Sequence, residues 1–277
     1  MFSTAKKLRR CKGGGVVCIL ICILLLLWLR ARLAMHAVKP TVVKTNPDLI
    51  EANQEDPGLV EILRKLILPP SGLPYSLNSP LRRHYSQVSQ DAYADYLLKE
   101  QRGGFFIEVG AGNGEDLSNS LFLEKTRGWS GLLVEPDPTS FSALSDKHRK
   151  AYSLNVGLSL NTTSYYAKFK PNAGLGRITS EGEDLIRIKT FPLFTMLLAL
   201  NVSTVDFLSL DIEGDELKVL RSVPWSRVII RLLCVEVKHH KGGPRPLIRY
   251  MKEQGYTFLG VKDIDAWFAH PSFKKHL

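Results

Sequence analysis

Short apolar runs alternate with amphipathic segments from residue 86 to the C-terminus. Strands are predicted where the apolar runs are short and continuous, at 105–109, 131–135, 151–160, 205–211, 228–237 and 256–262, with a terminal element at 266–270. Helices are predicted between them, at 87–101, 115–126, 138–147, 190–200, 215–222 and 246–254. Residues 165–170 are expected to form a hairpin with the end of the third strand. Strands separated by helices of this length favour a doubly wound, mostly parallel α/β sheet.

Residues 30–85 lack this alternation and are interpreted as a stem or linker. Seven prolines lie between positions 34 and 85, and proline interrupts regular structure. One short stretch differs, because its apolar residues recur at helical spacing and predict an amphipathic helix over 58–68. Packing of this apolar face on the body is the favoured interpretation. A partner-binding helix or a helix lying on a membrane remains the alternative.

The N-terminus has the pattern of a membrane anchor. Residues 13–29 contain no charged side chain, and a helix of this length spans roughly 26 Å, enough for a thin membrane. A cleavable signal peptide shares this pattern, but the bulky and charged residues 28–32 offer no small-residue cleavage site. Five basic residues precede the run, which favours a cytoplasmic tail at 1–12. We therefore expect a type II, single-pass protein of the endoplasmic reticulum or Golgi with a lumenal body.

The excess of basic residues is concentrated at the N-terminus. The net charge is +10, but residues 1–32 hold seven Lys or Arg and no acid, which leaves 30 basic against 27 acidic residues elsewhere. Nucleic-acid binding needs a concentrated basic face, so no nucleic-acid partner is expected. Two sequons, at Asn161 and Asn201, permit glycosylation of a lumenal body.

The first strong chemical signal is the glycine-rich turn 108–116, which follows a predicted strand directly. Alternate glycines at such a turn let the backbone approach a ligand closely. A dinucleotide site needs a further glycine where this chain has Glu115, and Glu115 and Asp116 would repel a phosphate at the start of the next helix. A ligand that carries a sulfonium and an ammonium group suits the turn better. We therefore predict S-adenosylmethionine, with Glu108 beside its methionine part and Gly110, Gly112 and Asn113 under its adenosine.

Acidic residues at the ends of later strands support a nucleoside site. Glu135 ends the second strand, where a carboxylate accepts hydrogen bonds from ribose hydroxyls, and Pro136 shapes the turn after it. Asp211 ends a later strand and faces the same crevice, so it is a candidate for orienting the substrate or acting as a base. Glu213 is a candidate for holding a substrate hydroxyl, although both acids also suit a helix N-terminus.

His239 follows the next strand and is a candidate base for a hydroxyl group. Its neighbour His240 is also a histidine, but adjacent side chains point in different directions from most backbones. We therefore predict no metal site.

Three sequence runs, at 106–115, 133–138 and 205–216, resemble the motifs of the FkbM family of S-adenosylmethionine-dependent O-methyltransferases. The resemblance covers about residues 85 to 265. Within that family, the runs at 118–124 and 129–133 resemble the animal branch that includes the insect protein Star. Members of that branch have an N-terminal membrane anchor, and Star is needed in the secretory pathway for export of EGF-receptor ligand precursors.

The resemblance implies a Rossmann-like class I methyltransferase fold over 86–277, after the tail, the anchor and the stem. It implies cofactor roles by position for Glu108, Gly110, Gly112, Glu135 and Asp211. Two functions stay open. The first is O-methylation of a hydroxyl or carboxyl group on a glycan, lipid or small metabolite at the lumenal face. The second is a Star-like, non-catalytic role in export of a membrane cargo protein between the endoplasmic reticulum and the Golgi.

Overall fold

The computed structural model describes residues 51–172, 176–240 and 242–273. The chain divides into two compact units, Met1–Thr45 and Asn46–Leu277, and every described residue belongs to the second. The predicted cytoplasmic tail at 1–12, the anchor at 13–29 and the first part of the stem lie outside the described residues. Among the described residues, no helix has the length and apolar character needed to cross a membrane.

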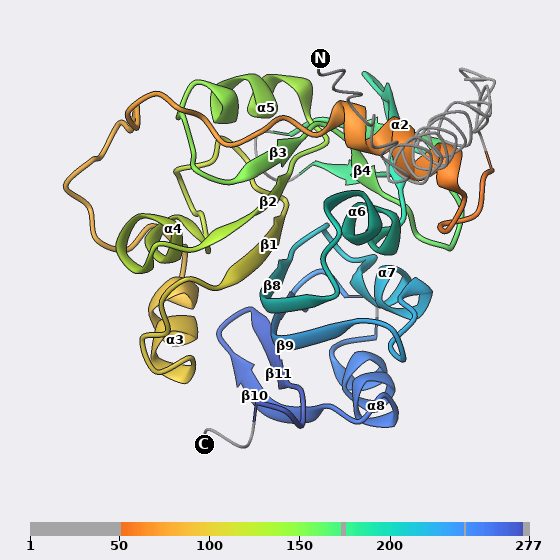
Figure 1. Ribbon diagram of the computed structural model, residues 1–277. Coiled ribbons are helices and arrows are strands. Elements are labelled where there is room, and N and C mark those ends of the chain that lie inside the picture. Colours follow the sequence, from red (N-terminus) through yellow and green to blue (C-terminus); the bar gives the residue numbers. More distant parts are fainter. Residues whose placement is uncertain (1–50, 173–175, 241, 274–277) are drawn as a thin grey trace, which may run out of the picture. The chain divides into compact units, whose positions relative to one another are not determined.

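A seven-stranded sheet forms the centre of the second unit, in the strand order β10-β11-β9-β8-β1-β2-β3 (Figure 1). Its strands are β1 Phe105–Val109, β2 Ser130–Val134, β3 Tyr152–Leu154, β8 Thr204–Leu210, β9 Ile229–Glu236, β10 Thr257–Lys262 and β11 Asp265–Ala269. The strands from β3 to β9 in this order pair in parallel, and β11 is antiparallel to both of its neighbours. The predicted mostly parallel, Rossmann-like sheet is confirmed.

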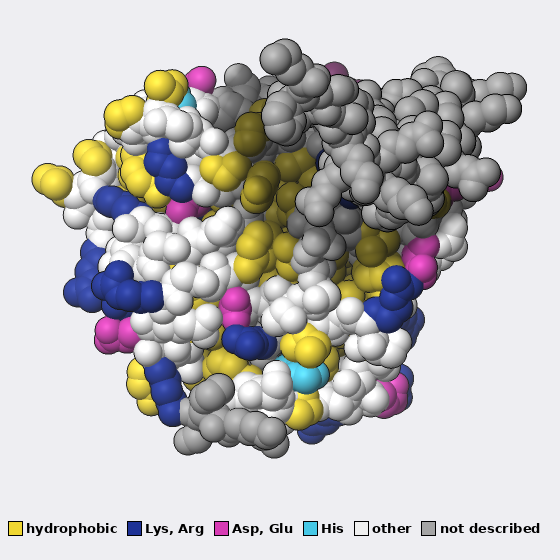
Figure 2. Space-filling view, in the orientation of Figure 1, with side chains coloured by type: hydrophobic (Ala, Val, Ile, Leu, Met, Phe, Trp, Pro, Cys, Tyr) yellow, Lys and Arg dark blue, Asp and Glu magenta, His cyan; other side chains and the backbone are white. Residues whose placement is uncertain are grey.

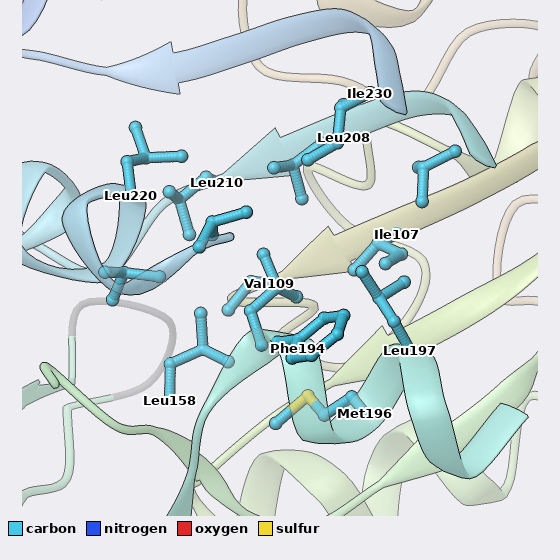
Figure 3. Packing of buried hydrophobic residues seen from close by; sticks show 14 of the residues in the cluster. Ile107, Val109, Leu158, Phe194, Met196, Leu197, Leu208, Leu210, Leu220 and Ile230 are labelled. Atoms are coloured by element: carbon cyan, nitrogen blue, oxygen red, sulfur yellow. The ribbon is translucent and has the colours of Figure 1, made fainter. Parts of the chain in front are cut away.

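Helices cover both faces of this sheet (Figure 1). One face carries α3 Gln90–Leu97, α4 Leu121–Arg127 and α5 Pro138–Ser145, and the other carries α2 Pro57–Leu66, α6 Leu193–Leu200, α7 Glu216–Ser222 and α8 Arg245–Glu253. Successive strand residues point to opposite faces, so Phe106 packs with Phe122 of α4 while Ile107 packs with Leu197 of α6 (Figure 3). Both faces are apolar, as expected for a buried parallel sheet.

The third predicted strand, 151–160, is wrong as a single element. The chain leaves the main sheet after β3 and continues as β4 in a second sheet with the order β4-β7-β5-β6. The strands of this sheet are β4 Gly157–Leu158, β5 Tyr165–Lys170, β6 Arg177–Ile178 and β7 Ile186–Phe191. Asn155 lies at the break, where its side-chain amide donates to the carbonyl of Glu135 over 2.8 Å.

The predicted pairing of 165–170 is also wrong, because β5 pairs with β6 and β7 rather than with the end of the third predicted strand. The helix predicted at 190–200 begins later, at Leu193. Pro192 is its N-cap and closes β7, since proline lacks the N–H that a strand or helix interior needs.

The predicted stem differs from the structure over its described part, because residues 51–85 run along the body. Backbone N–H groups of Glu51, Leu68 and Ser76 donate to body carbonyls over 2.7, 2.9 and 3.0 Å. The amphipathic helix is confirmed as α2, and its Leu59 and Leu63 are fully buried in the main core. Packing on the body, the favoured interpretation of this helix, is therefore confirmed.

Charged side chains of both signs are interspersed on the face shown in Figure 2, with Lys and Arg in small groups. This distribution agrees with the nearly balanced charge of the body. The absence of a nucleic-acid partner stays a prediction.

Substitutions in α2 test whether this helix is part of the hydrophobic core. Leu63→Ala should lower the free energy of unfolding by about 2–5 kcal/mol, because it leaves a cavity under the sheet. Leu66→Ala, on the 43% exposed neighbour, should change it by less than about 0.5 kcal/mol. Urea denaturation of the purified full chain measures both. Equal effects would show that α2 is not part of the core.

Candidate functional site

The ends of β1 and β8 touch at a position that only glycine fits. Gly110 has a φ of 80°, and a Cβ built on it would lie 2.3 Å from the backbone carbonyl oxygen of Asp211. The Asp211 N–H donates to the carbonyl of Val109 over 3.2 Å and closes the contact. This contact lies at the carboxyl edge of the sheet, where open α/β sheets bind ligands. Gly110 and Asp211 line two cavities.

The first cavity lies between the main sheet and the second sheet. Its apolar wall is formed by the second sheet and the residues that flank β4: Val156, Leu158, Leu160, Phe169, Ile178 and Ile188. Glu135 and Pro136, which follow β2, lie on its polar side. An apolar wall beside a carboxylate suits a nucleoside, with its flat base and hydroxylated sugar.

Glu135 is fixed by the backbone around it. Its two carboxylate oxygens accept hydrogen bonds from the N–H groups of Gly112 and Asp137, each over 2.8 Å. Burial raises the pKa of Glu135 to about 7, against the lowering effect of these two donors. The carboxylate therefore has a set orientation and keeps acceptor capacity toward the cavity.

The second cavity is more polar. Its lining includes Gln87, Gln90, Glu108, Gly112, Asn119, Ser209, Asp211, Glu213, Glu236 and His239. Gly112 has a φ of 54°, and no atom lies within 4 Å of the position that its Cβ would occupy. The backbone at Gly112 is therefore open to the cavity, as the glycine-turn argument predicted.

Glu108 holds the turn that follows the glycines. Its side chain accepts hydrogen bonds from the N–H of Asn119 over 2.6 Å, from the hydroxyl of Ser118 over 2.9 Å and from the hydroxyl of Ser120. Burial raises the pKa of Glu108, and the nearby Arg149 guanidinium opposes that rise. The helix predicted at 115–126 is therefore wrong at its start, because the donors bound to Glu108 form a turn and α4 begins at Leu121.

Two further predicted residues also shape this loop. The side-chain oxygen of Asn113 accepts hydrogen bonds from the N–H groups of Glu115 and Asp116 over 3.0 and 2.8 Å. The fully buried Glu115 pairs with Lys147 at 2.9 Å and binds the N–H groups of Asn78 and Ser79. The argument that Glu115 repels a phosphate at a helix start is wrong, because its charge is paired and no helix starts there.

The three candidate catalytic residues come together at the rim of the second cavity. The Nδ1 of His239 lies 2.7 Å from a carboxylate oxygen of Glu213 and 3.5 Å from Glu236. Glu213 has a φ of 64°, a backbone conformation that is strained for a residue with a side chain and typical of functional sites. Burial, followed by repulsion from Glu213 and Glu236, raises the pKa of Asp211 well above its usual value.

Sequence reasoning missed several site residues. Asn119 donates to the hydroxyl of Ser209 over 2.9 Å, while its other side-chain atom is buried without a partner in the described part of the chain. Gln90 reaches the second cavity from α3, far earlier in the sequence. The run Ser118-Asn-Ser120 carried the only signal for Asn119, and nothing marked Gln90.

The comparison with known families decides the cofactor. The model of the methyltransferase FkbM domain matches residues 108–258, more than half of the chain. The chain belongs to the FkbM methyltransferase family. Its cofactor is S-adenosylmethionine, and it is an S-adenosylmethionine-dependent methyltransferase. No curated protein sequence matches this FkbM chain.

Solved methyltransferase structures match the FkbM chain at low sequence identity. The METTL16 MTase domain is 15% identical, with 76% of this chain and 77% of that one covered and a TM-score of 0.43. Precorrin-6y C5,15-methyltransferase from Geobacter metallireducens GS-15 is 12% identical, with 64% and 84% covered and a TM-score of 0.37. The human methyltransferase 10 domain containing protein is 16% identical, with 70% and 87% covered and a TM-score of 0.37.

The residues present fit this cofactor. An apolar wall is available for the adenine ring, Glu135 for the ribose, and a buried oxygen of Asp211 without a partner in the described residues for a cationic ligand.

The open space at Gly112 gives a test with a matched control. Gly112→Ala should weaken S-adenosylmethionine binding about tenfold or more, roughly 1.4 kcal/mol, because the new methyl group enters the second cavity. Gly103→Ala has the same kind of backbone strain, with a φ of 69° and open space at its Cβ, but lies outside both cavities. Calorimetric titration of both variants should show the loss only for Gly112→Ala. An equal loss in both would assign the effect to strain.

Proposed function

We propose that the chain methylates oxygen, and that its acceptor is a hydroxyl group of a glycan, a lipid or a small metabolite. The observation that carries this proposal is the contact between His239 and Glu213. A carboxylate 2.7 Å from Nδ1 fixes the imidazole and leaves Nε2 available as a base. A hydroxyl needs such a base, because it is a poor nucleophile while it keeps its proton.

The proposed cofactor site uses both cavities. Glu135 holds the ribose, with Pro136 beside it, and Gly110 and Gly112 let the backbone come close to the ligand. Asn113 and Glu108 keep the loop in shape. The bound cofactor supplies a methyl group made electrophilic by a positively charged sulfur. Asp211 lies between the two cavities and favours that positive charge in a site of low dielectric.

Methyl transfer forms one bond, breaks one bond and moves one proton, and residues of the site can accept that proton. The acceptor oxygen attacks the methyl carbon, an O–C bond forms, and the S–C bond breaks with its electron pair remaining on sulfur as a neutral thioether. The hydroxyl proton passes to Nε2 of His239. Glu213 then stabilises the imidazolium through Nδ1–H. Holding the acceptor in line with the methyl group supplies most of the rate, and the base adds to it.

The role of His239 as the base is tested by a substitution that should change kcat and leave cofactor binding unchanged. His239→Ala should lower kcat by about 100-fold to 10,000-fold, the usual contribution of a general base, with the Kd for S-adenosylmethionine unchanged. Glu213→Gln should lower kcat less, because the imidazole loses its partner but keeps its lone pair. His148→Ala is the matched control, since His148 is bound to the Pro74 carbonyl and lines neither cavity.

The assay uses tritium-labelled S-adenosylmethionine with lipid, glycan and metabolite fractions of the secretory pathway. The proposal expects alkali-resistant label, as in a methyl ether. Label recovered in N-methylated amino acids would contradict methylation of oxygen. Label released as methanol by mild alkali would move the acceptor from a hydroxyl to a carboxyl group.

We propose further that the body is lumenal and tethered by the segment 13–29, as in the Star-like branch. Both sequon residues, Asn161 and Asn201, are exposed, which is compatible with glycan attachment. Two glycans sensitive to endoglycosidase H are expected on the full chain expressed in animal cells. Asn161→Gln and Asn201→Gln should each remove one of them in gel migration. An unglycosylated wild-type chain would contradict the lumenal placement.

The non-catalytic alternative, escort of a membrane cargo, gains no specific support from the described residues. Gly110 and Gly112, Glu135 and the contact between His239 and Glu213 lie around the two cavities, and a binding module would not need that last contact.

A further inference from the structure

Three carboxylates meet beside the second cavity, and ring nitrogens of His239 and His240 lie 3.5 Å from two of them, Glu236 and Glu216. Asp211 follows β8, Glu216 opens α7 and Glu236 ends β9, and one oxygen of each lies within 4.8 Å of the others. Glu216 is fully buried and Glu236 is 2% exposed. Buried carboxylates at this separation repel one another, so a cation or bound protons must compensate their negative charge.

The carboxylates are held so that each presents a free oxygen. One oxygen of Glu216 accepts from the N–H groups of Ile212 and Gly214, over 2.9 and 3.1 Å, and one oxygen of Glu236 accepts from the N–H of His239 over 3.1 Å. Their other oxygens, and Oδ1 of Asp211, are buried without a hydrogen-bond partner in the described part of the chain. Anchoring one oxygen fixes the direction of the other, as in a preorganised ligand set.

A histidine in the loop after β9 lies beside one of these three carboxylates. The side chain of His240 is 6% exposed, and its Nε2 lies 3.5 Å from Oε2 of Glu216. Neither atom has a hydrogen-bond partner within the described residues. A neutral imidazole nitrogen carries one lone pair, so two unpaired ligand atoms lie side by side in a buried place.

We propose that Asp211, Glu216, Glu236 and Nε2 of His240 bind one divalent cation. No metal site is predicted from the sequence, because the side chains of adjacent histidines diverge. In the structure His239 lies against Glu213 and His240 against Glu216, so the proposed site needs only one of the two histidines.

The ligand set favours Mn²⁺. Carboxylate oxygens suit Mg²⁺, Ca²⁺ and Mn²⁺, and imidazole adds a preference for transition metals. Mn²⁺ accepts six ligands in an octahedron, so four from the protein leave two positions open. An acceptor with two neighbouring oxygens, such as a vicinal diol, would fill both and have its hydroxyl proton made more acidic. This catalytic role rests on the proposed function, whereas the cation site itself does not.

The experiment is Mn²⁺ binding to the full chain, purified in detergent and stripped with EDTA, without S-adenosylmethionine. Electron paramagnetic resonance measures free Mn²⁺ during the titration. One Mn²⁺ per chain is expected, and the spin-echo spectrum of the bound ion should show coupling to one imidazole nitrogen. This readout uses the wild-type protein, so it does not depend on whether a variant folds. Absence of stoichiometric binding, or of the nitrogen coupling, overturns the site.

Variants assign the ligands. Glu216→Gln and Glu236→Gln should each weaken Mn²⁺ binding at least tenfold, and His240→Ala should abolish the nitrogen coupling. Glu253→Gln, an exposed glutamate on α8, is the matched control and should bind as the wild type does. Equal affinity in Glu216→Gln, Glu236→Gln and the control overturns the assignment.

The two proposals fail separately. If Mn²⁺ binds as described and EDTA leaves methyl transfer intact, the site stands and its catalytic role is overturned. If no methyl transfer to oxygen occurs under any condition, the proposed function fails, and Mn²⁺ binding still decides the site.

Discussion

The close approach of Gly110 to the backbone of Asp211 is the constraint on which the rest of the site depends. A side chain at position 110 would meet the Asp211 carbonyl at 2.3 Å, so any other residue would push the ends of β1 and β8 apart. Because those ends touch, the loops after β1, β2, β8 and β9 converge on one edge of the sheet. Gly110 and Asp211 line both cavities, and this edge of the sheet is where we propose that the nucleoside and amino-acid ends of the cofactor bind.

Buried negative charge is the second property that follows from this geometry. Asp211 lies between the cavities, with Glu213, Glu216 and Glu236 around it, and burial raises the pKa of Glu216 to about 7. Such a cluster costs free energy in an apolar setting unless positive charge enters it. A sulfonium ligand on one side and a divalent cation on the other would both supply that charge. Glu108, although also buried, is satisfied by the turn at 118–120 and serves the shape of the loop.

The sequence predicted the sheet well, because strands buried on both faces give continuous apolar runs that end in glycine or acidic residues. It also placed Glu135, Asp211, Glu213 and His239 at one edge, since the carboxyl ends of parallel strands meet there. It failed at 115–120, where hydrogen bonds to Glu108 override a helical pattern, and at 151–160, where the chain changes sheets. Gln90 and the partners of Glu115 come from distant segments, and no local pattern records such contacts.

The central claim is that the crevice around Gly110 and Asp211 binds S-adenosylmethionine, and a thermal-shift titration of the full chain tests it most directly. A ligand bound only to the folded state at 100 times its Kd stabilises that state by about 2.7 kcal/mol, so the melting temperature should rise with concentration along a single saturable curve. The same titration of Asp211→Asn should shift to higher concentrations. A melting temperature that does not move in the wild-type chain, or identical curves for both proteins, would contradict the account.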